Sequence, residues 1–363
     1  MTVCPTSCEE LAEALRDASS RGRTITVLGR NSKHAMAGPM LESEVTISTA
    51  RLNRILQYEP RDLTISVEAG IPYSQLSRTL AENGQMIPLD PPFAEGCTIG
   101  GVVAANVSGP RRRVYGTARD MVIGMKFVTV EGKIVQSGGM VVKNVAGLDM
   151  AKMMIGSFGT LAAIAVINFK LSPIPPQTRT FVQQFVNVQN AIGARNEIHK
   201  GVLQPIALDL VKENGTYRLL AQGAGNRAVL ERYGRELKQA ESLGGDQEER
   251  VWTAVREHTP SFLLQHNEAS VIRVSSSLQE IGRVLAAFPG DAVARAGSGI
   301  CYGYFENWRD AAGRGVMEYG PPEARTCAEL WPRLPKDFET MKKVKTMFDP
   351  QNLLNRRRLY GRI

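Results

Sequence analysis

Residues 98–116 read TIGGVVAANVSGPRRRVYG, with two adjacent glycines, a run of small residues, a further glycine and three consecutive arginines within nineteen positions. Glycine lets a backbone approach another group closely or adopt a positive φ, so this stretch constrains the fold strongly. Three interpretations are open: a cradle for phosphate, a patch that binds nucleic acid, or an ordinary polar turn after a buried strand.

The distribution of charge disfavours nucleic acid. The formal net charge is +8, but the basic residues are scattered, and only residues 111–113 and 356–358 form arginine triplets. Aromatic residues make up 6% of the chain, which leaves little side-chain surface to stack on bases. We therefore expect no nucleic-acid partner.

Targeting and metal-binding signals are missing from the sequence. The amino terminus does not follow the pattern of a secretory signal, and no apolar stretch approaches the ~20 residues that a membrane span needs. Five cysteines, an odd number, favour reduced thiols, and neither the spacing of Cys4 and Cys8 nor the four histidines forms a metal motif. We expect a cytoplasmic protein without a metal site, and any association with membranes would be made through partners.

Hydrophobic periodicity predicts an α+β protein in two parts. The elements expected in the first part are a helix after Ser7, strands at Thr24–Gly29, Val45–Ser48 and Leu63–Val67, a helix with Pro72 in its first turn, a hairpin across Ile123–Val135, a helix at Met150–Ile155 and a strand at Thr160–Leu171. The segment SPIPPQ, residues 172–177, contains three prolines and marks a domain boundary.

After that boundary, TFVQQFVNV and YRLLAQ predict strands, and helices are expected near Asn187–His199 and Arg227–Ser242. Residues from Trp331 through Met347 have a helical pattern. We therefore expect domains at residues 1–172 and 173–330, with residues 331–363 as a helical segment that returns to the first domain.

Two donor-rich loops suit a long anionic cofactor. VLGRNSKHAMAG, residues 27–38, follows one predicted strand, and TIGG, residues 98–101, opens the glycine-rich stretch. Main-chain N–H groups on both loops would surround the oxygens of a pyrophosphate. The strand-then-G-x-G-x-x-A pattern in LLAQGAGNRAVL, residues 219–230, has no acidic strand end about 20 residues further on, and an ordinary strand-to-helix turn is the better interpretation.

The segments TIGGVVAANVSGPRRRVYGTARDMVIGMKFVTVEGKIV, VVKNVAGLDMAKMMIGSFGTLAAI and FDPQNLLN resemble the vanillyl-alcohol-oxidase, or PCMH-type, FAD-binding family, and within it the E-subunit branch of bacterial glycolate oxidases. The resemblance covers the first 172 residues in order and returns at the carboxyl end. It implies a PCMH-type FAD-binding domain of two α+β subdomains and a smaller α+β cap domain.

The resemblance also implies which residues bind FAD, with the pyrophosphate against the first loop. These residues are Leu28, Gly29, Arg30, Asn31, Ser32, Lys33, His34, Cys97, Thr98, Ile99, Gly100, Gly101, Asn106, Gly109, Gly156, Ser157, Gly159, Thr160 and Ile164. Lys143 is placed near the flavin in the same way. Residues 111–113 form a basic loop that steadies a reduced flavin or docks a partner, and a solvated turn is an equal alternative.

Several positions depart from the family pattern. The phosphate loop has Arg30 and Asn31 where relatives have glycines, and the closing Asn-Pro-Gly appears as residues 355–357, Asn-Arg-Arg. Some relatives attach flavin covalently through cysteine and histidine, but Cys97 and His34 are displaced from those positions, so non-covalent binding is the preferred hypothesis.

The departure with most consequence concerns catalysis. Relatives that oxidise 2-hydroxy acids carry a histidine-rich segment, and the corresponding residues 295–300 here read RAGSGI, without imidazole or carboxylate. Arg273 and Arg295 are weak catalytic candidates, because they can clamp a substrate carboxylate but supply no base.

The function hypothesis is an FAD-binding subunit of a glycolate-oxidase-like complex that relays electrons. The implied partners are a catalytic flavin subunit and an iron–sulfur subunit. Two alternatives stay open: an autonomous FAD-dependent oxidoreductase with its own 2-hydroxy acid substrate, and a non-catalytic structural subunit that keeps the flavin fold.

Overall fold

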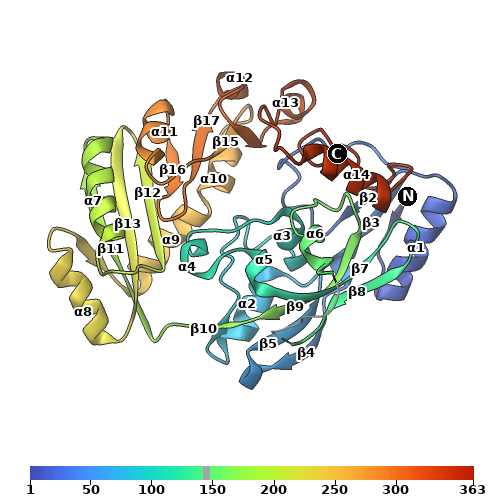
Figure 1. Cartoon of the computed structure of the whole chain (residues 1–363), viewed down its shortest axis with the longest axis horizontal. Coiled ribbons are helices and arrows are strands. Elements are labelled where there is room, and N and C mark those ends of the chain that lie inside the picture. The colour runs from blue at the N-terminus through green and yellow to red at the C-terminus, as the bar shows by residue number, and fades with distance from the viewer. Residues whose placement is uncertain (142–147) are drawn as a thin grey trace. The chain divides into compact units, whose positions relative to one another are not determined.

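The computed structural model describes residues 1–141 and 148–363, which form two compact units (Figure 1). Unit 1 consists of Met1–Ser108, Thr117–Ile174 and Arg333–Ile363. Unit 2 consists of Gly109–Gly116 and Pro175–Pro332. Both units combine helices and sheets, which confirms the α+β fold class. Lys143 lies outside the described residues.

Unit 1 contains two main sheets. The three-stranded sheet has the order β1-β3-β2 with parallel pairs, and the five-stranded sheet has the order β4-β5-β9-β7-β8 with antiparallel pairs. The strands are β1 (Thr2–Val3), β2 (Ile25–Leu28), β3 (Val45–Ser48), β4 (Ile55–Glu59), β5 (Thr64–Glu68), β7 (Val122–Val128), β8 (Ile134–Gly138) and β9 (Ala163–Lys170), and a separate antiparallel pair joins β6 (Gln85–Met86) to β10 (Ser172–Pro173).

Helices and short 3-10 turns connect these strands. They are α1 (Cys8–Ser20), α2 (Tyr73–Ala81), α3 (Ile99–Ala105), α5 (Ala118–Met121), α6 (Ala151–Met154) and α14 (Phe338–Phe348), with 3-10 turns at Thr49–Arg51 and Pro60–Asp62. The Ser7 hydroxyl accepts a hydrogen bond from the Glu10 N–H at 3.1 Å and caps α1 as the sequence predicts.

The core between the two sheets of unit 1 includes the carboxyl end of the chain. Leu11 and Leu15 of α1 pack with Ile47 of β3, and all three side chains are 0% exposed. Leu353 and Leu354 belong to the same cluster. The C-terminal residues are therefore part of the core of unit 1, because they supply apolar surface that the first 174 residues do not complete alone.

Unit 2 is built on one eight-stranded sheet whose pairs are all antiparallel. In spatial order its strands are β14 (Glu241–Leu243), β11 (Gln177–Phe185), β13 (Thr216–Gly225), β12 (Ala207–Glu213), β16 (Ala292–Arg295), β17 (Ile300–Phe305), β15 (Ser270–Ser275) and β18 (Val316–Tyr319). The helices are α4 (Arg112–Tyr115), α7 (Val188–Lys200), α8 (Arg227–Glu236), α9 (Gly245–Arg256), α10 (His258–Gln265), α11 (Ile281–Ala287), α12 (Trp308–Ala311) and α13 (Pro322–Cys327). Helices α7 and α11 pack on each other and on this sheet (Figure 1).

Several sequence predictions differ from the structure. The helix predicted at Arg227–Ser242 ends at Glu236, and residues 241–243 form β14 because they pair with β11 at the sheet edge. The helical pattern from Trp331 gives a helix only from Phe338, since prolines at 332 and 335 remove main-chain donors. Pro72 is the N-cap of α2 and does not lie inside its first turn.

The dinucleotide-like pattern at residues 219–230 forms an ordinary turn from β13 to α8. Strand β13 has only antiparallel neighbours among the described residues, β11 and β12. A dinucleotide fingerprint requires a parallel βαβ unit, so the interpretation of this pattern as a decoy is correct.

The buried thiol of Cys301 on β17 predicts an alkaline loss of stability. Burial raises the pKa of this thiol from 9.0 to about 11, so folding favours its protonated form. This contribution is complete below pH 9.0 and is lost as the pH rises to about 11. Denaturant unfolding should show that the wild type loses about 2–3 kcal/mol more than Cys301→Ala across this window. Cys4→Ala, at an exposed position, is the control, and equal slopes for wild type and Cys301→Ala would contradict the prediction.

Candidate functional site

A cleft in unit 1 brings together four segments that are distant in sequence. It has about 1020 Å³ of atom-free space, including its open mouth. The loop after β2, the start of α3, the turn before β9 and the C-terminal residues Asn355, Arg356 and Arg358 line it. The predicted cofactor-binding residues that line this cleft are Leu28, Gly29, Arg30, Asn31, Ser32, Lys33, Thr98, Gly100, Gly101, Gly159 and Ile164.

The loop after β2 presents main-chain donors to the cleft. Asn31 adopts φ 57°, a left-handed conformation that asparagine tolerates better than most residues. Among the described residues, no hydrogen bond uses the main-chain N–H groups of Arg30, Asn31 or Ser32. Adjacent N–H groups without a protein acceptor at the edge of a cleft suit an anion such as a phosphate.

Arg358 fixes the shape of this loop from the carboxyl end of the chain. Its guanidinium donates to the main-chain oxygens of Met36 and Gly38, and to that of Lys33 at 2.8 Å. The same guanidinium lies 5.9 Å from the ring centroid of Phe158. One arginine therefore satisfies three carbonyls of an irregular loop and fixes the shape of that loop where it lines the cleft.

The start of α3 uses its main-chain donors within the protein. The Ile99 N–H donates to Ile71 O at 3.0 Å and the Gly100 N–H to Ala69 O at 2.7 Å, while the Gly101 N–H donates to the Thr98 hydroxyl at 3.2 Å. The prediction that main-chain N–H groups of both loops surround a pyrophosphate therefore needs correction, because those of Ile99, Gly100 and Gly101 are already paired. The loop after β2 can supply such donors, whereas Gly100 and Gly101 supply a stretch of cleft wall without side chains.

The glycines of this region allow segments of the protein to approach one another. A Cβ on Gly29 would lie 2.4 Å from Thr98 Oγ1, and a Cβ on Gly100 would lie 2.7 Å from Ala69 O. At Gly101 the nearest atom to such a Cβ is Thr98 Oγ1 at 3.3 Å, and Gly101 lines the cleft. Gly101 is thus a position where side-chain atoms would fill the cleft and displace a ligand.

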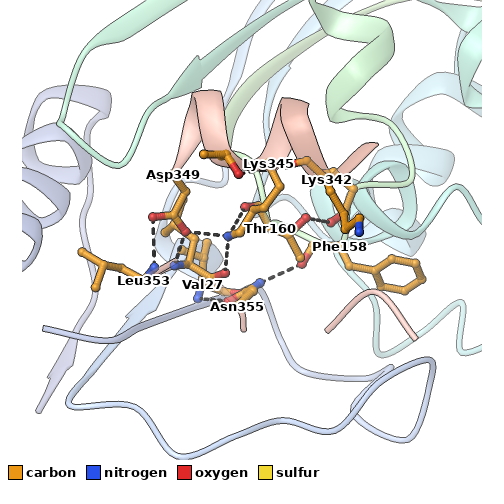
Figure 2. Close-up of polar contacts among 11 residues, drawn as sticks. Val27, Phe158, Thr160, Lys342, Lys345, Asp349, Leu353 and Asn355 are labelled. Atoms are coloured by element: carbon orange, nitrogen blue, oxygen red, sulfur yellow. Dashed lines mark hydrogen bonds and ion pairs between the residues drawn. The ribbon is translucent and has the colours of Figure 1, made fainter. Parts of the chain in front are cut away.

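The turn before β9 is joined to the carboxyl end of the chain by the Asn355 side chain (Figure 2). The Asn355 carboxamide donates to Phe158 O at 2.7 Å, and it accepts from Val27 N at 2.7 Å. Nearby, Lys345 Nζ donates to Thr160 O at 2.8 Å. These contacts come from residues 345–355, in the segment that the sequence predicted to return to the first domain, although the departure at 355–357 left the terminal contact undefined.

Other predicted residues lie outside the cleft lining. They are His34, Cys97, Ile99, Asn106, Gly109, Gly156, Ser157 and Thr160. The side chains of Cys97, Ile99 and Thr160 are at most 1% exposed and belong to the interior of unit 1. Asn106 ends α3 with φ 49°, and its buried Oδ1 has no hydrogen-bond partner among the described residues. Gly109 lies in unit 2.

The two residues considered for covalent attachment differ in environment. Cys97 is buried, and its Sγ donates to Ala94 O at 3.6 Å, whereas His34 is exposed, with Nδ1 3.3 Å from Asn31 O. Neither residue lines the cleft. These positions support non-covalent cofactor binding.

The cleft has a cationic lining that the sequence indicated only in part. Arg30, Lys33, Arg356 and Arg358 line it, with Glu42 as the acidic residue among the lining groups. The triplet at 356–358 was noticed for its charge, but nothing local connected it to residues 30–33. An excess of cations in a concave site raises the local concentration of anionic ligands.

The arginine triplet at 111–113 belongs to unit 2, although the sequence placed it in the first domain. Arg113 donates to Pro205 O at 2.7 Å and to Gln204 Oε1 at 3.3 Å. Burial lowers the pKa of Arg112. The side chains of Arg112 and Arg113 are therefore partly buried and not fully solvated.

Arg273 and Arg295, the weak catalytic candidates, both form ion pairs in unit 2. Arg295 on β16 pairs with Asp209, which is 0% exposed, and Arg273 Nε on β15 lies 2.8 Å from Glu318 Oε2. Burial opposes the charge on Arg295, but Asp209 raises the pKa of this guanidinium overall. Burial also raises the pKa of Glu318, although Arg273 partly opposes the rise. Sequence reasoning missed both carboxylates, since each lies far from its partner along the chain.

The described part of the chain offers neither a metal-binding cluster nor a membrane-spanning helix. No group of three or more His, Cys, Asp and Glu side chains within residues 1–141 and 148–363 is arranged to hold a metal ion. Within the same ranges, no helix combines the length and the apolar character needed to cross a membrane.

Comparisons with known proteins also indicate an FAD-binding protein. Residues 1–138 match the family described as "FAD binding domain". Glycolate oxidase subunit GlcE of Escherichia coli is 31% identical over 257 residues, which cover 70% of this chain and 69% of that protein. Glycolate oxidase subunit GlcD of Bacillus subtilis is 28% identical over 58% of this chain, and the match spans only 45% of that longer protein. A solved alkyldihydroxyacetonephosphate synthase superposes with a TM-score of 0.73 at 19% identity, over 98% of this chain and 75% of that one, which supports the fold.

The fold and the cleft together define a protein that binds a flavin nucleotide. The chain belongs to the PCMH-type family of FAD-binding oxidoreductases, and FAD is its cofactor. The unpartnered N–H groups after β2, the cationic lining and the side-chain-free wall at Gly101 fit the diphosphate of this cofactor.

Two glycine variants test the cleft as the FAD site. Gly101→Leu should weaken FAD binding at least tenfold by filling the cleft, and its Cβ, 3.3 Å from Thr98 Oγ1, meets a side-chain hydroxyl and no main-chain atom. Gly100→Ala should instead lower the unfolding midpoint, since its Cβ meets a main-chain oxygen. Flavin fluorescence titration and thermal unfolding of the apoprotein measure the two effects. Unchanged FAD affinity in Gly101→Leu would place the cofactor elsewhere.

Acid precipitation tests the mode of attachment. Because Cys97 is buried and His34 does not line the cleft, we expect all the yellow colour in the supernatant and a colourless protein pellet. The absorption spectra of the two fractions give the result. Colour that stays with the pellet and disappears in Cys97→Ala would show a covalent bond.

Proposed function

We propose that this chain is the FAD-binding subunit of a glycolate-oxidase-like complex and relays electrons between its flavin and partner subunits. The partners are a catalytic flavin subunit and an iron–sulfur subunit. Support comes from the similarity to a protein named as a glycolate oxidase subunit, which extends over 70% of this chain. The same proposal places the protein in the cytoplasm, with any membrane association made through its partners.

The observation that carries the proposal is the pairing of both candidate clamp arginines. Oxidation of a 2-hydroxy acid needs a cation for the carboxylate and a base for the hydroxyl proton. Arg295 is occupied by Asp209, and Arg273 by Glu318. Residues 295–300 supply no imidazole. A substrate carboxylate would have to displace a buried carboxylate of the protein, so unit 2 is poorly equipped for glycolate.

FAD supplies the redox chemistry when it is bound, and the residues of this chain hold it in place. The N–H groups of residues 30–32 bind the diphosphate, and the cations that line the cleft balance its charge. Arg358 keeps the loop in the binding conformation through carbonyl oxygens at 33, 36 and 38. The function of unit 1 is thus to bind and orient the cofactor.

One observation favours an autonomous oxidoreductase as the second candidate. Glu318 is buried, and its raised pKa suits a proton acceptor. Tyr302 on β17 is the cross-strand neighbour of Arg273 on β15. Under this alternative, Glu318 takes the hydroxyl proton of a 2-hydroxy acid and Arg273 then binds the carboxylate.

Anaerobic mixing with glycolate distinguishes the two candidates. The FAD-loaded chain alone should keep its visible flavin absorption, and bleaching should begin only when the catalytic subunit is added, about 100-fold faster or more, because the chain lacks a positioned base. Rapid bleaching of the isolated chain that is lost in Glu318→Gln would support the autonomous enzyme. Failure of the folded chain to take up FAD would instead indicate a structural subunit and would overturn both candidates.

A further inference from the structure

Asn355 connects two walls of the FAD cleft through a single carboxamide. Its Oδ1 accepts from Val27 N at 2.7 Å, and its Nδ2 donates to Val27 O at 3.0 Å and to Phe158 O at 2.7 Å (Figure 2). Val27 lies on β2, just before the loop that presents its N–H groups to the cleft, and Phe158 begins the turn before β9. Val27 and Phe158 both line the cleft, as does Asn355 itself.

The contact between Asn355 and the turn is close enough to require glycine at 159. Gly159 adopts φ +71°, and a Cβ there would lie 2.6 Å from Asn355 Nδ2. The turn, the asparagine and the end of β2 therefore have one joint arrangement. A change in any of them has to move the other two.

The chain around Asn355 is fixed independently by a buried ion pair. Lys345 on α14 and Asp349 are 7% and 1% exposed, and Lys345 Nζ donates to Asp349 Oδ2 at 2.5 Å and to Leu354 O at 3.1 Å. Asp349 in turn accepts from Leu353 N at 2.9 Å and Leu354 N at 2.8 Å. The main chain then runs along β2, where Ile25 N donates to Leu353 O and Asn355 N donates to Ile25 O, both at 2.9 Å.

We propose that Asn355 is a positioning residue for FAD, and that cofactor binding and docking of the C-terminal segment 331–363 stabilise each other. The segment sets the spacing between the loop after β2 and the turn before β9, and FAD needs this spacing to reach both. Because coupling between two binding events is reciprocal, bound FAD holds the segment as firmly as the segment favours FAD. The inference rests on FAD as the cofactor and is independent of the proposed role in a complex.

Two substitutions at 355 separate the contacts. Asn355→Leu removes the acceptor and both donors, and it should weaken FAD binding at least tenfold, which corresponds to about 1.4 kcal/mol. Asn355→Asp retains an acceptor for the Val27 N–H but loses the donors to Val27 O and Phe158 O. Its FAD affinity should therefore fall as well, with the loop after β2 partly retained.

Leu15→Ala is the matched control for a merely structural effect. Leu15 belongs to the same core as Leu354 and is 0% exposed, but it does not line the cleft. This variant should lower the unfolding midpoint of the apoprotein and leave the FAD dissociation constant within twofold of wild type. FAD affinity is measured by fluorescence titration well below every midpoint, so that unfolding does not contribute.

The reciprocal effect is measured by proteolysis. Lys342 and Lys343 are exposed on α14, and a lysine-specific protease should cut there more slowly when FAD is bound to the wild type. FAD at saturating concentration should protect Asn355→Leu less. The proposal is overturned if both Asn355 variants bind FAD within twofold of wild type, or if FAD leaves the cleavage rate of the wild type unchanged. Wild-type protein that binds no FAD would contradict the cofactor assignment instead, and the two failures are therefore distinguishable.

Discussion

The cleft depends on the hydrogen bonds between the Asn355 carboxamide and the main chain of Val27 at the edge of β2. Strand β2 pairs with β3 along one edge, and on its other edge it meets the chain at Leu354 in a parallel bridge. An unpaired strand edge leaves main-chain donors and acceptors unsatisfied, which is costly inside a protein. The last residues of the chain thus complete the first sheet, and the loop that follows β2 has a defined position only because they do.

Local sequence signals predicted the elements that carry the cleft, but not the reason for their glycines. The helix after Ser7 and the strands ending at Leu28 and Ser48 form as the periodicity indicates. Gly29 and Gly100 do mark close approach, as expected of glycine. The approaching groups are Thr98 Oγ1 and Ala69 O, however. A glycine pattern therefore predicts that another group lies close to the backbone, but it does not predict whether that group belongs to the protein or to a ligand.

Contacts between distant residues account for most of what the sequence did not reveal. Asn355 and Val27 are separated by 328 positions, and Arg295 and Asp209 by 86. Periodicity reports which face of an element is buried and contains no information on which polar side chains meet across it. The resemblance to a family supplied the order of the segments, yet the Asn-Arg-Arg ending at 355–357 made the terminal contact uncertain until the structure showed the bonds of Asn355.

The ion pairs of unit 2 also limit what its sheet can bind. A buried arginine attracts a substrate carboxylate only in so far as its charge is not already balanced, and Glu318 balances Arg273 at 2.8 Å. Burial raises the pKa of Glu318, so a proton taken up by this carboxyl would neutralise it and weaken its attraction to Arg273. The pair of Arg295 with Asp209 differs, because Asp209 is 0% exposed and its negative charge keeps the pKa of the Arg295 guanidinium raised. The two pairs are therefore unequal: the pair of Arg295 with Asp209 is buried in the sheet, whereas protonation of Glu318 would weaken its pair with Arg273.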